Sequence, residues 1–314
     1  MIKVPKLQLP TIKLKKPQIN YKKLAIRLSI ISVLLFFVSG YIAYNKLYLT
    51  NERRFWSAID NSLATSSVVR SVESGGTGNK TVETTRFNFG TEATINRITS
   101  VGTKNATSES NVTTQNILTP TAQYVRYENI FTSEKKASGG DYDFSSIKGV
   151  WAKQAEATSP EEADQLKLSY VQPQVTLAPF GNLRAVDRRQ IVKELKDSNV
   201  YEIDYTKTLR TVIDDKQFIM LPAKVKLKSY VTVLQKHFDF MGFGMFPPLN
   251  ADNYPDKARY SVQFLVNPSN NTIAGIKLDS QTENYSNYGV NAKAPIPNDA
   301  IPLDELQQKL QSLQ

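Results

Sequence analysis

The residue types that most often perform chemistry in proteins are sparse in this chain. His237 is the single histidine among 314 residues, and there is no cysteine. A catalytic triad needs an imidazole base within reach of an activated nucleophile, and no Gly-x-Ser-x-Gly turn accompanies His237. We therefore interpret His237 as a structural residue and expect no enzyme. The lack of cysteine also excludes thiolate zinc sites, a cysteine nucleophile, disulfides and a lipid-modified N-terminal cysteine.

Two kinds of partial motif can be read as chance matches. Residues 75–81 resemble a phosphate-binding loop, but Asn79 and Ser74 stand where that loop needs glycine, so a β-turn is the better interpretation. Ser133 and Ser145 each begin a Ser-x-x-Lys pair like that of penicillin-binding enzymes, but the companion elements are missing.

One short segment begins like a calcium-binding loop. Asp141 and Asp143 have the right spacing, but no glycine stands at the sixth position and Ala152 replaces the closing glutamate. A weak surface ion site stays open as an alternative. We expect no cofactor and no tightly bound metal ion.

The segment 238–248 is the most unusual part of the sequence because it gathers phenylalanine and methionine around two glycines and two prolines. Gly242, Gly244 and the prolines disfavour a regular helix, so the apolar side chains could form the mouth of a hydrophobic cavity. The alternative is ordinary core packing at a helix end. The candidate ligand-binding residues are Phe238, Phe240, Met241, Phe243, Met245 and Phe246.

The positive charge is confined to one end of the chain. The net charge is +10, but residues 1–46 hold nine basic side chains and no acidic one, which leaves 30 basic against 29 acidic residues in the remainder. A nearly neutral domain has no electrostatic footprint for DNA or RNA, so we expect no nucleic-acid partner.

An apolar run follows this basic end. Residues 28–44 carry no charge, and residues 24–49 as a whole are long enough to form a transmembrane helix that crosses a bilayer once. The flanking lysines predict that residues 1–23 form a disordered cytoplasmic arm, which places residues 50–314 outside the cytoplasm in the cell envelope. The rival interpretation is a cleaved signal peptide, because Val38 and Gly40 are small enough for a processing site.

The region 50–314 predicts an α+β domain with a mainly antiparallel sheet. Residues 66–131 alternate apolar and polar side chains between glycine turns, which is typical of four or five antiparallel strands. Helices are expected after the N-cap Ser159 and over 184–196, 225–241 and the C-terminal residues. A hairpin is expected over 260–278.

The order of these elements resembles the LolA-like envelope lipoprotein carriers, including the LppX and LprG type. The features that carry the resemblance are a Trp-bearing helix, the segments YVRYENIF, GVWAKQ and NVYEIDY, the hairpin ARYSVQFLVNPSNNTIAGIKLD and the closing NYSNYGVNAKAPIP. The resemblance implies a half-barrel sheet wrapped around helices, with a hydrophobic cavity for acyl chains. The chain departs from the family in its anchor, because those proteins are soluble or attached through a lipidated cysteine.

Together these features predict a membrane-anchored, non-enzymatic domain that binds a lipid or another hydrophobic ligand in the cell envelope. The alternative is a structural or protein-interaction domain with a filled core and no ligand.

Overall fold

The computed structural model describes residues 21–43, 50–90, 93–244, 249–279, 281–290 and 294–313, with side chains in the first helix described for residues 29–41. The chain divides into two compact units, Met1–Thr50 and Asn51–Gln314. The three hydrophobic clusters all lie within the second unit, which therefore has its own core.

The first unit contains one helix, α1 (Tyr21–Ala43). Its described side chains are exposed, with Phe36 at 75% and Phe37 at 68%. Within the described part of the chain, no helix combines the length and hydropathy needed to cross a membrane. Residues 1–20 of the expected arm and 44–49 of the expected membrane helix lie outside the described residues, so arm and anchor stay predictions.

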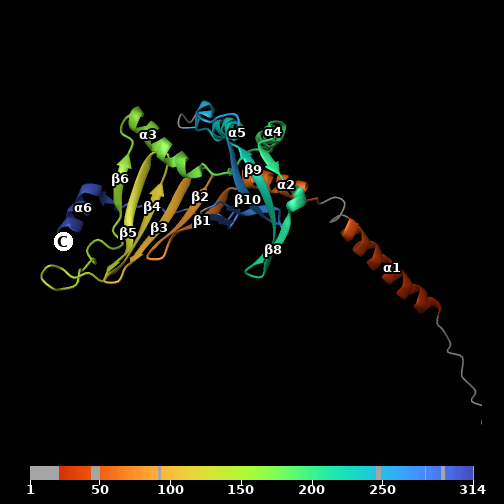
Figure 1. Cartoon of the computed structure of the whole chain (residues 1–314), viewed down its shortest axis with the longest axis horizontal. Coiled ribbons are helices and arrows are strands. Elements are labelled where there is room, and N and C mark those ends of the chain that lie inside the picture. The colour runs from red at the N-terminus through yellow and green to blue at the C-terminus, as the bar shows by residue number, and fades with distance from the viewer. Residues whose placement is uncertain are drawn as a thin grey trace, which may run out of the picture. The chain divides into compact units, whose positions relative to one another are not determined.

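The second unit is built on one large curved sheet (Figure 1). Its strands are β1 (Ser67–Gly76), β2 (Asn79–Asn88), β3 (Thr94–Lys104), β4 (Glu109–Leu118), β5 (Ala122–Thr132), β6 (Ala152–Glu156), β7 (Tyr201–Ile203), β8 (Leu209–Ile213), β9 (Lys216–Lys226), β10 (Arg259–Asn267), β11 (Thr272–Lys277), β12 (Thr282–Ser286) and β13 (Ile301–Pro302). The order is β13-β6-β5-β4-β3-β2-β1-β12-β11-β10-β9-β7, with β8 also paired to β9.

The first five strands form the expected meander of antiparallel hairpins. The β1–β2 turn is tight, because Gly76 pairs with Asn79. A Cβ at Gly75 would lie 2.1 Å from Asn79 O, and Gly75 has φ +108°, so only glycine fits there. Residues 75–81 are thus a hairpin turn, as the sequence predicted.

Two sequence-distant halves of the sheet meet where β1 pairs with β12, from Val69↔Ser286 to Glu73↔Thr282. All pairs between the named strands of the described residues are antiparallel except β13–β6, in which Ile301 pairs with Ala152. The α+β class and the mainly antiparallel sheet are confirmed, and the single parallel pair makes the sheet mixed.

The helices cover this sheet. They are α2 (Asn51–Ala64), α3 (Pro160–Val171), α4 (Ala185–Asp197), α5 (Leu227–Phe240) and α6 (Leu303–Gln311). Buried residues of α2 recur every three to four positions, and this face packs on β10, β11 and α4. Phe55 of α2 contacts Phe264 of β10 and Tyr201 of β7 edge to face, at centroid distances of 5.2 and 5.4 Å. This is the centre of the main core, while α6 closes a smaller one beside β6 and β13.

Local capping chemistry positions α3. Ser159 accepts a hydrogen bond from Glu162 N at 3.2 Å, and Pro160 occupies the first helical position. The helix continues into a 3₁₀ turn, η2 (Gln172–Gln174). In Figure 1, α3, α4 and α5 lie along the upper border of the sheet.

Candidate functional site

The end of α5 determines where the predicted ligand-binding segment lies. Gly242, with φ +83°, donates its N–H to Asp239 O at 2.9 Å, and Phe243 donates to Phe238 O at 2.9 Å. This is a Schellman motif, which stops the helix and redirects the chain. The turn holds Phe243 beside the last residues of the helix.

The predicted residues divide between the core and a pocket. Phe238 is fully buried in the main core, so we assign it to packing. Phe240, Met241 and Phe243 are half-buried and line one pocket together. Met245 and Phe246 lie outside the described residues.

We call the space beside these three residues the aromatic pocket. Its volume is about 260 Å³. Its described lining is Phe89, Gly90, Ala93, Tyr170, Asn182, Leu183, Arg184, Asp187, Phe240, Met241 and Phe243. The ring of Tyr170 lies 5.5 Å from that of Phe243, and burial raises the pKa of the Tyr170 hydroxyl, which therefore stays neutral. One wall is polar, because Arg184 pairs with Asp187 at 2.8 Å.

A close approach fixes Met241 in this wall. A Cβ at Gly181 would lie 3.1 Å from both Met241 Sδ and His237 Cε1, so a larger residue there would push on both side chains. His237 is buried, and its Nε2 lies 3.0 Å from Phe180 O. Because a carbonyl only accepts, Nε2 carries the proton. Burial lowers the pKa of His237 to about 4, so the ring is neutral.

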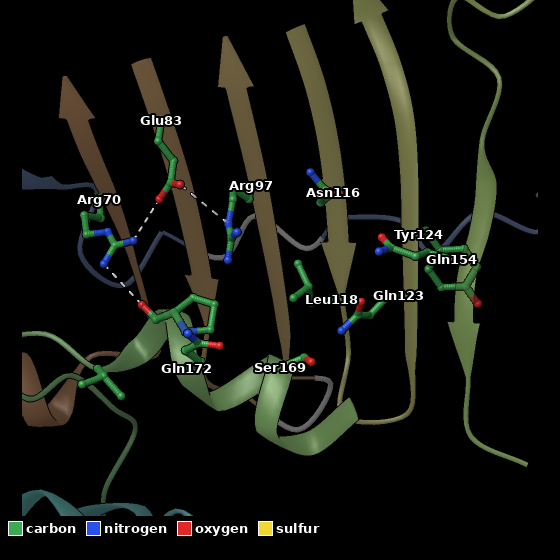
Figure 2. Close-up of a pocket in the computed structure, with 12 residues that line it drawn as sticks. Arg70, Glu83, Arg97, Asn116, Leu118, Gln123, Tyr124, Gln154, Ser169 and Gln172 are labelled. Atoms are coloured by element: carbon green, nitrogen blue, oxygen red, sulfur yellow. Dashed lines mark hydrogen bonds and ion pairs between the residues drawn. The ribbon is translucent and has the colours of Figure 1, made fainter. Parts of the chain in front are cut away.

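A second, larger hollow lies beside α3 and η2 (Figure 2). We call it the arginine pocket. Its volume is about 500 Å³, and its lining is Arg70, Glu83, Arg97, Asn116, Leu118, Gln123, Tyr124, Gln154, Ser169, Gln172, Pro173 and Val175. The floor is set by the register of the sheet, because Arg70, Thr85, Arg97 and Asn116 are successive cross-strand partners on β1 to β4. Partners opposite one another point to the same face.

Glu83 is the centre of the charges in this pocket. Its Oε1 accepts from Arg70 Nη2 at 2.9 Å and from Thr85 Oγ1 at 3.0 Å. Its Oε2 lies 3.9 Å from Arg97 Nε, an ion pair too long for a hydrogen bond. Arg70 also donates to Pro173 O and lies over the Phe87 ring, 5.5 Å from its centroid.

The partial motifs of the sequence do not assemble into a site. Ser133 Oγ accepts from Glu109 N, and Asp143 accepts from Ser145 N at 2.9 Å, so these side chains stabilise loops. Asp141 pairs with Lys135. Nowhere in the described ranges do three acidic or histidine side chains gather closely enough to hold a metal ion.

Sequence reasoning missed the arginine pocket. Arg70, Glu83 and Arg97 lie one on each of three strands, so the signal in the sequence is a single charge on one face of each strand. That signal becomes a cluster only when the pairing register is known, since a shift by one residue reverses the faces.

Comparisons with known proteins add little. No protein family and no curated protein matches the chain. Among solved structures, the crystal structure of LprF from Mycobacterium bovis is similar with a TM-score of 0.36 and 12% identity, over 78% of this chain and 96% of that one. This is a weak likeness of fold, too weak to transfer a ligand or a role.

Proposed function

We propose that the chain is a membrane-anchored, non-enzymatic binding protein whose folded unit takes a hydrophobic group in the aromatic pocket. The observation that carries the proposal is the convergence of Phe240, Met241 and Phe243 with Tyr170 and Phe89 around unfilled space. Aromatic and methionine side chains adapt to apolar ligands of varied shape.

The size of the pocket limits the ligand. At about 260 Å³ it is slightly smaller than the pockets that usually hold whole small molecules, which begin near ~300 Å³. It suits one short acyl chain or one ring system.

The binding test replaces one pocket side chain with a polar one. In the isolated Asn51–Gln314 unit, Phe243→Ser should weaken the binding of a fluorescent fatty-acid analogue by about tenfold or more. The reason is that a buried phenylalanine contributes about 1.5 to 3 kcal/mol of free energy. Phe131→Ser is the matched control, since Phe131 is 48% exposed at the end of β5 and does not line the pocket. Fluorescence titration and thermal unfolding of both variants and the parent make the measurement.

The rival function is a structural or interaction domain without ligand, which the complete burial of Phe238 and the modest pocket volume favour. Native mass spectrometry of the purified unit separates the two. Absence of any copurified apolar ligand, together with no probe binding by the parent, would refute the binding function and leave the rival in place.

The anchor is a separate part of the proposal. It rests on the uncharged run 28–44, on the basic residues before it and on the exposed apolar side chains of α1. Protease added outside spheroplasts should digest the folded unit and spare a tag placed before Met1. A mature N-terminus at Tyr41, or digestion of the tag in intact spheroplasts, would contradict an anchored chain with a cytoplasmic arm.

A further inference from the structure

We propose that the arginine pocket binds a small hydroxylated anion, such as a sugar acid or a sugar phosphate. The site is distinct from the aromatic pocket and does not depend on the function proposed for it. The inference combines an uncompensated positive charge, a ring of unused hydrogen-bonding side chains and a hollow of suitable volume.

The charge of the pocket is positive. Two guanidinium groups, of Arg70 and Arg97, face one carboxylate, of Glu83, which gives a formal charge of +1 (Figure 2). Glu83 Oε1 accepts hydrogen bonds from Arg70 and Thr85, whereas Oε2 makes only the longer 3.9 Å contact with Arg97. Arg97 is therefore the less compensated of the two cations, and an incoming anion would meet it first.

A purely structural ion network would leave fewer hydrogen-bond donors unpaired. Buried polar atoms normally have hydrogen-bond partners, yet the buried Nε atoms of Arg70 and Arg97 have none among the described residues. The Arg97 side chain is 29% exposed, so its guanidinium is held at the sheet but remains open to the hollow. A carboxylate or a phosphate matches the planar donor fork of arginine with two parallel hydrogen bonds.

The neutral side chains around the arginines indicate that the anion also carries hydroxyl groups. Amides and hydroxyls both donate and accept, as sugar hydroxyls do. Five such side chains line the hollow, and none makes a side-chain hydrogen bond to another described residue: Asn116, Gln123, Gln154, Ser169 and Gln172.

The volume of the pocket and the small number of apolar side chains in its lining further limit which ligands fit. About 500 Å³ lies within the range of small-molecule pockets and is ample for a monosaccharide derivative. Leu118, Pro173 and Val175 are the apolar side chains in the lining apart from the ring of Tyr124. An acyl chain would leave the amides and guanidinium groups unsolvated and unpaired, which costs free energy.

The test uses the full chain in detergent and three probes measured by calorimetry: glucuronate, glucose 6-phosphate and uncharged glucose. We expect glucuronate or glucose 6-phosphate to bind at least about tenfold tighter than glucose, because hydrogen bonds to a charged group are strong. Comparing the first two probes tells whether the site recognises a carboxylate or a phosphate.

Three variants locate the binding. Arg97→Gln should lower the affinity for the anion by about tenfold or more, since it removes the guanidinium that is open to the hollow. Glu83→Gln should have the opposite effect and raise the affinity for the anion by about fivefold, because the carboxylate that competes for the arginines is lost. Arg86→Gln should leave affinity unchanged, because Arg86 is on β2 but alternates to the other face from Thr85.

Melting curves of all three variants identify any that fail to fold. Among the described residues, Arg97→Gln removes one ion pair, the 3.9 Å contact with Glu83. Failure of both anions to bind the folded parent would overturn the proposal. So would equal affinity for glucose, or equal losses in Arg97→Gln and Arg86→Gln. None of these results bears on the fatty-acid titration of the aromatic pocket.

Discussion

Phe238→Ala is expected to lower the unfolding free energy of the Asn51–Gln314 unit by about 3 to 5 kcal/mol. The Phe238 ring is completely buried in the main core, and its removal leaves a cavity that the surrounding helices and strands refill only in part. Urea unfolding at neutral pH measures the change.

The control for this loss is Phe131→Ala, in which a half-exposed ring of the same size is removed. Its cost should stay within about 0.5 kcal/mol, as for most surface substitutions. If Phe238→Ala were as mild as Phe131→Ala, the ring would not belong to the packed core, and the division of the 238–243 segment into a core part and a pocket part would fail.

The second large effect is a loss of stability in mild acid that His237 causes. Its folded pKa is about 4 instead of the usual 6.5. The unfolded chain therefore takes up the proton first as the pH falls. The stabilisation is complete above about pH 6.5, is lost progressively between pH 6.5 and 4, and totals about 3 kcal/mol.

The structural reason is that only one nitrogen of the ring has a hydrogen-bond acceptor for its proton. Nε2 donates to Phe180 O, whereas Nδ1 is buried with no partner among the described residues. Urea unfolding at pH 8 and pH 5 should show a loss of about 2 kcal/mol in the parent. In His237→Gln, which keeps a side-chain donor but does not titrate, this loss should be absent. An equal loss in the variant would assign the acid sensitivity to other groups.

The sequence predicts elements wherever the information is local. The capping residues before α3 and the turn glycine at Gly75 each fix a conformation through their nearest neighbours, so the helix and the hairpin could be recognised in advance. The apolar spacing of α5 likewise predicts a helix, although its first two expected residues, Val225 and Lys226, belong to β9.

The strand β9 itself was not predicted, and Pro222 explains why. Proline lacks the N–H that a central strand donates, so it argues against a strand that is paired on both sides. Here β7 pairs with residues 223–225 of β9 and β8 with residues 216–220. Pro222 falls in the gap between the two partners, and only its carbonyl is used, by Asp204 N at 3.0 Å.

The sequence alone likewise does not predict which residues come together in the two pockets. Phe240, Met241 and Phe243 could be selected from composition, but Phe89 and Tyr170 join them only through the tertiary packing of β2, α3 and α5. Arg97 and Glu83 look like ordinary surface charges of two strands until the register places them under α3. Long-range pairing, which carries this information, is not encoded in any single window of the sequence.

The β1–β12 junction has a consequence for how the protein is made. The meander β1 to β5 is complete once the first 132 residues have been synthesised, but the outer edge of β1 stays open until Thr282–Ser286 emerge. An unpaired edge strand is a template for association with other chains. The border of the nascent sheet at β1 therefore stays uncovered while residues 133–281 are synthesised, and β12 then covers it. A ribosome that stalls before residue 282 would release a chain with the meander formed and its adhesive edge exposed.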